Sequence, residues 1–275
     1  MSNRKTPGAM LLYAILAAAV AVNVAWAGAR EEGRLLTATE VLEDVRAMPD
    51  VRLPDTLLAH AYGIAVIPDV TKVAFIFGGR HGNGVLVVRD HLTGPWSNPC
   101  FVSLTGGSWG FQAGAQSSDI ILVFTTKRGI EGIAGGKITL GADASVATGP
   151  VGRQGSAGTD ITFNAEIYSY ARTRGLFGGI ALDGSVISID RSANASLYHK
   201  SGITATDIFA GQTPPLPATA QRFLERLAEA TRTTVRAATS PDAPPAGAPP
   251  APGNAPPAAE PARTYPLDDS KKPPP

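Results

Sequence analysis

The stretch "FVSLTGGSWGFQAGAQSSDIILVF", residues 101–124, places a glycine-rich centre between two apolar, β-branched runs. Runs such as "FVSL" and "DIILVF" are typical of short strands. Glycine inside strand-rich sequence marks bulges, sharp bends or a close approach of two backbones. We therefore expect two strands here, joined by a glycine-rich connection, in a sheet that is strongly curved.

The strand pattern recurs on both sides of this stretch. In "TFNAEIYSYAR", residues 162–172, strict alternation sets Ile167 against Tyr168 and predicts one buried face and one wet face. Residues 175–190, "GLFGGIALDGSVISID", predict a hairpin with Asp183–Gly184 at its turn. Further strands are expected within 63–68, 72–79, 84–90 and 136–141.

Three segments have helical spacing instead. Residues 32–50 carry an apolar stripe and end at Pro49, residues 53–63 form a shorter helix, and residues 214–239 form a third. Strands that follow one another without long helices between them favour antiparallel pairing. The sequence therefore predicts an α+β fold, with a strongly curved or barrel-like antiparallel β-sheet and flanking N-terminal and C-terminal helices. The stripe of the first helix is Leu35, Ala38, Val41, Leu42, Val45 and Met48.

The two ends of the chain differ in composition from the region between them. A basic start and an apolar run that closes on small residues predict a secretory signal peptide over 1–27, cleaved after Ala27. A retained transmembrane anchor is the alternative, because the run is nearly long enough to span a bilayer. Residues 238–275 are rich in Pro and Ala and predict a disordered tail. One folded domain is expected over 28–237.

Charge and cysteine content exclude several classes of protein. Residues 28–237 hold 19 Lys/Arg and 19 Asp/Glu. Nucleic-acid-binding domains normally carry a basic excess, so no nucleic-acid partner is expected. The one cysteine, Cys100, has no partner for an internal disulfide and is interpreted as a buried small apolar residue. The histidines lack the spacing of metal ligands, so neither a metal nor a cofactor is expected.

Residues 106–110, Gly-Gly-Ser-Trp-Gly, match the G-x-S-x-G pattern of a hydrolase nucleophile elbow. That motif needs a strand, the serine on a tight turn and then a helix. A helix is not expected after Gly110, because the following residues are rich in glycine and serine and lead into another strand. We therefore expect a protein that is not an enzyme. A serine hydrolase that uses Ser108 is a remote alternative.

Four separated blocks of sequence resemble the SYLF domain, a lipid-binding module that is also described as a yeast-type actin-binding domain. They are "LPDTLLAHAYGIAVIPDV", "SLTGGSWGFQAGAQSSDIILVF", "KITLGADASVATGPVGR" and "EIYSYARTRGLFGGIALDGSVI", in this order, and the resemblance covers about residues 35–208. The resemblance implies a non-catalytic module that binds anionic phospholipid or a membrane surface. It also implies that Ser108 is a turn residue. With the export signal, the chain looks like an exported bacterial member of this family.

Membrane contact is expected from apolar side chains on glycine-shaped connections, flanked by basic side chains that reach phosphates. A competing interpretation places Leu176 and Phe177 in the core of a hairpin. The apolar candidates are Trp109, Phe111, Leu176 and Phe177, and the basic candidates are Lys127, Arg128, Arg172 and Arg174.

The favoured function is a phospholipid-binding or membrane-binding module of the bacterial cell envelope. We expect it to be exported, periplasmic or secreted, and peripherally attached to a membrane. A second interpretation is a structural or protein-interaction domain of the envelope, which reaches a protein partner through its Pro-rich tail.

Overall fold

The computed structural model describes residues 28–48, 53–74, 77–109, 114–150, 164–173 and 176–238. The predicted signal peptide over 1–27 and the tail from residue 239 onward lie outside the described residues. Within the described part, no helix combines the length and the apolar composition that crossing a membrane requires.

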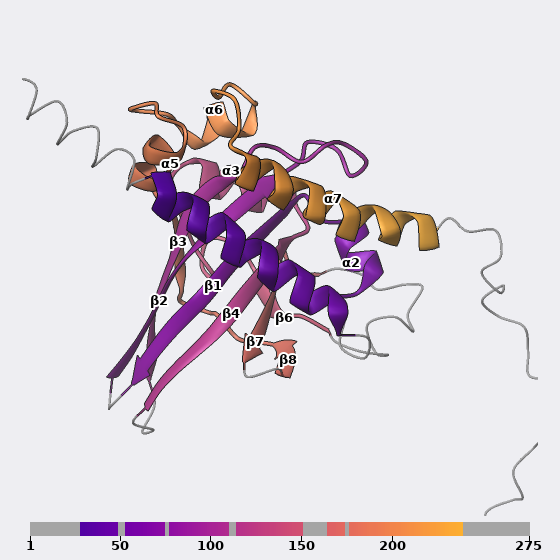
Figure 1. Ribbon diagram of the computed structural model, residues 1–275. Helices are drawn as coiled ribbons and strands as arrows, with labels where there is room; N and C mark the ends of the chain where they lie inside the picture. The colour runs from indigo at the N-terminus through magenta and orange to yellow at the C-terminus, as the bar shows by residue number, and fades with distance from the viewer. Residues whose placement is uncertain are drawn as a thin grey trace, which may run out of the picture. The chain divides into compact units, whose positions relative to one another are not determined.

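The described strands form one strongly curved sheet (Figure 1). Their order is β5–β9–β3–β2–β1–β4–β7–β6, and β8 pairs with β7. The strands are β1 (Gly63–Ala74), β2 (Phe77–Val88), β3 (Cys100–Trp109), β4 (Gly114–Phe124), β5 (Lys137–Thr139), β6 (Val146–Thr148), β7 (Ile167–Thr173), β8 (Leu176–Gly179) and β9 (Val186–Ile189).

The predicted α+β class and the curved sheet are confirmed, with one exception in strand direction. β6 pairs with β7 in parallel, whereas the other ladders are antiparallel. Parallel neighbours need a long connection between them, and residues 149–166 provide one. The sheet is therefore mixed at this edge.

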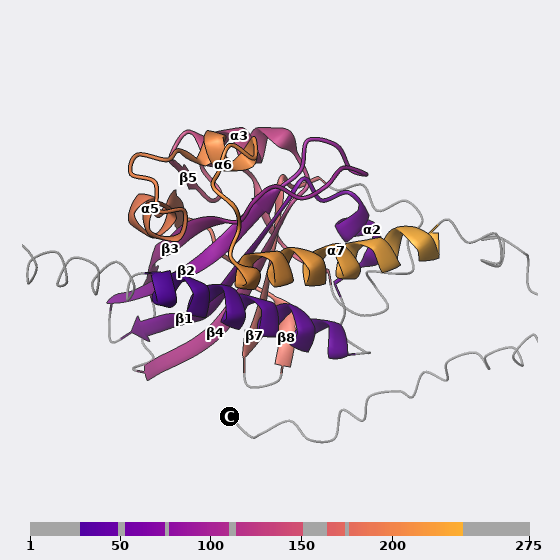
Figure 2. The same cartoon turned by 45° about the horizontal axis from the view of Figure 1, so that its top comes forward.

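Two long helices lie side by side on one face of the sheet (Figures 1 and 2): the first helix, residues 28–47, and α7 (Ala218–Ala238). The apolar stripe predicted for the first helix is buried, except that Met48 is only partly covered. The short helix α2 (Asp55–Ala59) contacts α7. Since the stripes repeat at the helical period, each helix buries one side on the sheet and leaves the other to solvent.

The opposite face of the sheet has a second core. Ala65, Leu86, Leu104 and Ile120 belong to it, together with Ile133 of α3 (Lys127–Ala134). Both faces of the central strands are thus covered, which accounts for their nearly continuous apolar sequence.

The sequence patterns missed three short helices: α3, α5 (Arg191–Leu197) and α6 (Ala205–Phe209). Each begins at a side chain that accepts a hydrogen bond from a backbone N–H of the first turn, namely Thr126, Asp190 and Thr204. Thr204 and Asp207 form a complete capping box. These caps were the available sequence signal, but the helices are too short to show a periodic stripe.

Strand β1 contains a bulge at its centre. The pairing registers of β1 with β2 and with β4 both shift around Pro68 and Asp69. Pro68 lacks an N–H for the ladder, so a bulge is where a central strand tolerates it. Gly84 faces this bulge, and a Cβ atom there would lie 2.3 Å from the carbonyl oxygen of Val66. Glycine therefore allows β2 to approach the bent strand closely, as predicted for a curved sheet.

Two local predictions are wrong. Residues 175–190 do not form a hairpin, because β8 pairs with β7 while β9 pairs with β3 and β5. The turn at Asp183–Gly184 is present, but it lies in the segment that connects β8 to β9, and these two strands do not pair with each other. The prediction that one face of β7 is exposed to solvent is also wrong. Ile167 and Tyr170 lie on opposite faces of this strand, and both are fully buried because a hydrophobic core covers each face.

Candidate functional site at the distal end of the sheet

The ends of β1, β2, β3 and β4 meet at one end of the sheet. Ala74 pairs with both Gly78 and Gly114, and Phe77 pairs with Trp109. In Figure 1 the ends of β1, β2 and β4 extend beyond the part of the sheet that the helices cover. We call residues 72–74, 77–80, 106–109 and 114–116 the distal end.

The distal end exposes an apolar and a basic side chain next to each other in sequence. Val73 is 57% exposed, and Lys72 is exposed as well. Arg80 lies directly opposite Lys72 on β2 and is half-buried. Within the described ranges, neither Lys72 nor Arg80 takes part in an ion pair. This end of the sheet therefore carries positive charge without an ion pair on one face and the exposed Val73 on the other.

The predicted pair Leu176 and Phe177 is divided between solvent and core. Leu176 is 79% exposed. Phe177 is buried, and its ring stacks on Tyr170 with the ring centroids 5.4 Å apart. Leu176 pairs with Thr173, next to the level of Asp119 on β4, which sets it back from Gly114 by about 15 Å. Only Leu176 of this pair is available to a partner.

Arg172 is engaged within the protein. Its Nε donates to Asp119 at 2.9 Å, and its Nη1 donates to Asp44 of the first helix. Both partners are carboxylates, so the positive charge of Arg172 is compensated. Arg172 therefore fastens the first helix to β4 and β7.

Lys127 and Arg128 lie at the opposite end of the sheet. They begin α3 just after Phe124, and β4 separates Phe124 from Gly114 by about 34 Å. The Arg128 side chain is 82% exposed and lies 3.9 Å from Glu166. The structure therefore does not bring these two residues together with the distal end.

Trp109 is the last residue of β3 and belongs to the distal end. Phe111 and Arg174 lie outside the described residues. Their proposed contribution to lipid binding stays a prediction.

Ser108 lies within a strand, so the prediction that it is a turn residue is wrong. It pairs with Gly78 in the ladder of β3 with β2, and β3 continues to Trp109. A nucleophile elbow would place this serine on a turn between a strand and a helix. The only downstream histidine, His199, follows α5, which packs on β3 near Phe101, about 24 Å along the strand from Ser108. The arrangement does not support the hydrolase alternative.

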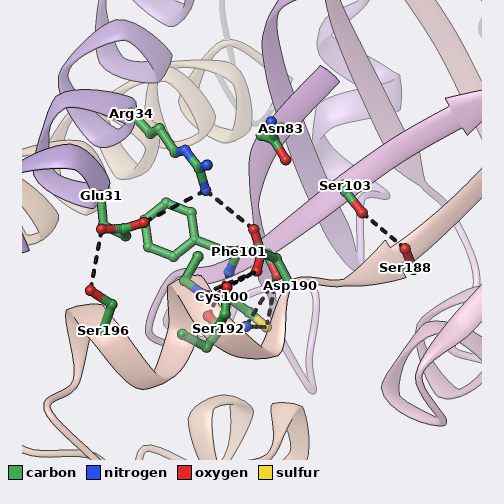
Figure 3. Close-up of polar contacts among 12 residues, drawn as sticks. Glu31, Arg34, Asn83, Cys100, Phe101, Ser103, Ser188, Asp190, Ser192 and Ser196 are labelled. Atoms are coloured by element: carbon green, nitrogen blue, oxygen red, sulfur yellow. Dashed lines mark hydrogen bonds and ion pairs between the residues drawn. The ribbon is translucent and has the colours of Figure 1, made fainter. Parts of the chain in front are cut away.

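A polar cluster joins the first helix to α5 (Figure 3). Arg34 Nη1 donates to Asp190 at 3.3 Å, and Ser196 Oγ donates to Glu31 at 3.3 Å. Asp190 also caps α5, since it accepts from the backbone N–H of Ala193 at 3.0 Å. These bonds hold the first helix across the sheet, which is a structural role.

Cys100 is fully buried beneath this cluster, as predicted for a small apolar residue. Burial raises the pKa of its thiol to about 12. The thiol therefore stays protonated at neutral pH and is a poor nucleophile. Among the described residues, no group of three or more His, Cys, Asp or Glu side chains is placed to hold a metal ion.

The sequence interpretation missed Lys72 and Arg80. The available signal was the segment "KVAFIFGGR", residues 72–80, in which a basic residue stands at each end of an apolar run. The sequence pattern predicts one strand for this segment, whereas the structure divides it between the end of β1 and the start of β2. The antiparallel pairing of β1 with β2 brings the two basic residues opposite each other.

Comparison with known proteins places this fold in a family. Residues 105–230 match the family model described as "Ysc84: Las17-binding protein actin regulator". The chain carries a domain of the Ysc84 family, to which the SYLF domain belongs, and the resemblance seen in the four sequence blocks is confirmed.

Several relatives contain the same region. An SH3 domain-containing protein of Schizosaccharomyces pombe is 37% identical over 186 residues, which cover 66% of this chain and 42% of that protein. Human SH3 domain-containing YSC84-like protein 1 is 35% identical over 180 residues, covering 65% of this chain and 52% of the human protein. LAS seventeen-binding protein 3 of Saccharomyces cerevisiae is 34% identical over 172 residues, which cover 62% of this chain and 37% of the yeast protein. The chain matches about half or less of each relative's length.

Proposed function

We propose that this chain is a non-catalytic module that binds the surface of anionic phospholipid membranes through the distal end of its sheet. The observation that carries the proposal is the meeting of four strand ends, where Val73 is exposed on one face of the sheet and Lys72 and Arg80 lie on the other. The sequences that connect these strands add Phe75, Ile76 and Phe111.

The chemistry of this end suits an interface between water and lipid. A large apolar side chain that leaves water contributes about 1.5–3 kcal/mol. Each basic residue near an anionic surface adds about 1 kcal/mol. Tryptophan prefers the headgroup level because its ring is apolar and its N–H is polar. A few such residues give reversible, peripheral attachment.

The site of action that we propose is the bacterial cell envelope, in the periplasm or outside the cell. Support comes from the basic start and apolar run of residues 1–27, which have the pattern of a secretory signal peptide. Attachment of a folded domain to the outer surface of a membrane fits such a location.

A protein-interaction function is the second candidate. The matched family is described by its binding to Las17 and its regulation of actin, and the yeast relative is named for the same binding. The Pro-rich sequence over 238–275 offers a segment of the kind that peptide-binding domains recognise. Co-purification of a protein that persists after lipid extraction, with no lipid binding, favours this candidate.

Vesicle flotation tests the first candidate. Residues 28–275 are mixed with phosphatidylcholine vesicles that contain increasing phosphatidylglycerol or cardiolipin. The protein should float with anionic vesicles, and the Trp109→Ser/Phe111→Ser variant should lose about tenfold or more in apparent affinity, since two apolar side chains are removed.

The matched control is Lys127→Gln/Arg128→Gln, which removes two charges from the opposite end of the sheet. This control should float within about twofold of the unmodified protein, since charges more than a Debye length from the lipid are screened. If the unmodified protein stays at the bottom with every lipid composition, the membrane proposal fails.

A further inference from the structure

A cleft of about 490 Å³ lies at the end of the sheet opposite the distal end. One wall comes from the connection between β2 and β3, and the other comes from α6 and the residues just after it. Val88 borders the cleft and pairs with Gly63 at the start of β1, whereas the distal end lies at the other end of that strand. The volume is within the range that small molecules occupy.

Hydrogen bonds hold both walls of the cleft in place. The backbone N–H of Val88 donates to Ser97 Oγ at 3.0 Å, and the backbone N–H of Ser97 donates to the carbonyl oxygen of Val88 at 2.7 Å. Asn98 Nδ2 donates to Thr213 Oγ1 at 2.7 Å, which ties the connection between β2 and β3 to the segment after α6. The cleft is therefore formed before any ligand enters, which reduces the entropy lost on binding.

Arg89 lines the cleft and is only 8% exposed. Its Nε donates to the carbonyl oxygen of Ala61 at 2.6 Å, and its Nη2 donates to those of Leu58 and Ala59 at 3.0 and 3.1 Å. Its Nη1 has no hydrogen-bond partner within the part of the chain that the structure describes, and the protein does not enclose this atom completely. Nη1 is therefore a donor that a molecule in the cleft can reach.

The positive charge of Arg89 is also uncompensated. Among the described residues, no carboxylate lies within ion-pair distance of it. The three carbonyl groups accept hydrogen bonds but carry no net charge. Burial lowers the pKa of Arg89, because the charged form has lost water, yet an arginine stays charged at neutral pH. An anion in the cleft would compensate this charge.

The other side chains of the cleft restrict the kind of anion. Trp96, whose ring centroid lies 4.5 Å from the Arg89 guanidinium, and Phe209 are both partly buried and supply apolar surface. Asp90 is exposed in the same lining, so a second negative charge on a ligand would be repelled. A single carboxylate on an aromatic or aliphatic body meets these conditions.

We propose that this cleft binds a small monocarboxylic acid with an apolar body. A carboxylate oxygen accepts a hydrogen bond from Nη1 of Arg89, and the apolar body packs against Trp96 and Phe209. The proposal goes beyond the proposed membrane function and does not depend on it, because the cleft and the distal end lie at opposite ends of the sheet.

NMR of the full chain tests the cleft with benzoate as the probe. The reporter is the indole N–H of Trp96, which donates to Thr231 at 3.3 Å, and Trp96→Phe identifies its signal. We expect sodium benzoate to shift this signal saturably. At equal ionic strength, benzyl alcohol lacks the charge and terephthalate carries a second one. Each should bind about tenfold or more weakly than benzoate.

Three variants separate the parts of the cleft. Ala210 is exposed and lines the cleft, so Ala210→Trp fills it at little cost to the fold and should weaken benzoate binding about tenfold or more. Asp90→Asn should remove the discrimination against terephthalate. Lys137→Gln is the matched control, because Lys137 lies on β5, three strands across the sheet from β2, and this variant should bind benzoate as the unmodified chain does.

The proposal is overturned if folded Ala210→Trp, checked by circular dichroism, binds benzoate as tightly as the unmodified chain. It is equally overturned if benzoate and benzyl alcohol bind with the same affinity, since the charge of Arg89 would then play no part. Vesicle flotation is measured separately. Loss of flotation with benzoate binding retained would remove the membrane function and leave the cleft, and flotation without benzoate binding would do the reverse.

Discussion

Cys100 and Asn194 show how single residues hold the centre of this fold. The Asn194 side chain accepts from the backbone N–H of Phe101 at 2.7 Å and donates to the carbonyl oxygen of the same residue at 3.1 Å. Its Nδ2 also lies 3.5 Å from the Cys100 sulfur. A side chain of α5 thus satisfies the backbone of β3 above a thiol that water does not reach.

Because the Cys100 thiol is buried, we predict that the free energy of unfolding falls at alkaline pH. Burial raises the pKa of Cys100 from 9.0 to about 12, so between these values the unfolded chain loses a proton that the folded protein keeps. The free energy of unfolding therefore falls as pH rises through this window. For Cys100 the fall is about 1–2 kcal/mol between pH 7 and 10. Urea unfolding at both pH values measures it.

Cys100→Ala provides the control for this prediction. The substitution removes the titrating group, so the stability difference between the unmodified protein and the variant should narrow by about 1–2 kcal/mol from pH 7 to pH 10. A difference that stays constant would show that the thiol titrates normally in the folded state.

At the scale of elements, the bulge of β1 requires a glycine at position 84 of the neighbouring strand β2. A Cβ at position 84 would lie 2.3 Å from Val66 O and 2.7 Å from Ile67 Cα, so backbone has to move. We expect Gly84→Ala to lower the free energy of unfolding by about 3 kcal/mol, at the upper end of typical overpacking. Thermal or urea denaturation gives the value.

Gly79→Ala is the matched control on the same strand. The nearest atom to a Cβ there is the carbonyl oxygen of Gly106, at 4.0 Å, which is ordinary contact. This variant should stay within about 0.5 kcal/mol of the unmodified protein. Equal losses for the two variants would mean that the bulge does not require glycine at position 84.

The elements also show which features are readable from sequence. The stripe of the first helix and that of α7 were predictable, because burial follows a local period. The pairing of β9 with β3 was not, because the turn at Asp183–Gly184 resembles a hairpin turn whichever strands it connects. The ion pair of Arg172 with Asp44 likewise joins residues far apart in sequence. The candidate site was therefore only partly predictable. Trp109 ends β3 and belongs to the distal end, whereas Leu176 lies back from that end, Phe177 is buried and Lys127 lies at the opposite end of the sheet.

At the scale of the whole domain, the helices cover one face of the sheet and leave the distal end of the strands projecting (Figure 2). The membrane proposal requires this end, and no other surface, to contact lipid. Residues 28–275 contain only two tryptophans, Trp96 and Trp109. Trp96 lies at the other end, where Arg89 stacks on its ring at 4.5 Å, so Trp96→Phe leaves Trp109 as a single reporter at the distal end.

The most direct measurement is therefore Trp109 fluorescence in residues 28–275 carrying Trp96→Phe, titrated with phosphatidylglycerol vesicles that contain brominated lipid. If the distal end inserts, the emission shifts to shorter wavelength and bromine quenches it in step with flotation. Emission that stays unshifted and unquenched while the protein floats would mean that another surface binds the membrane.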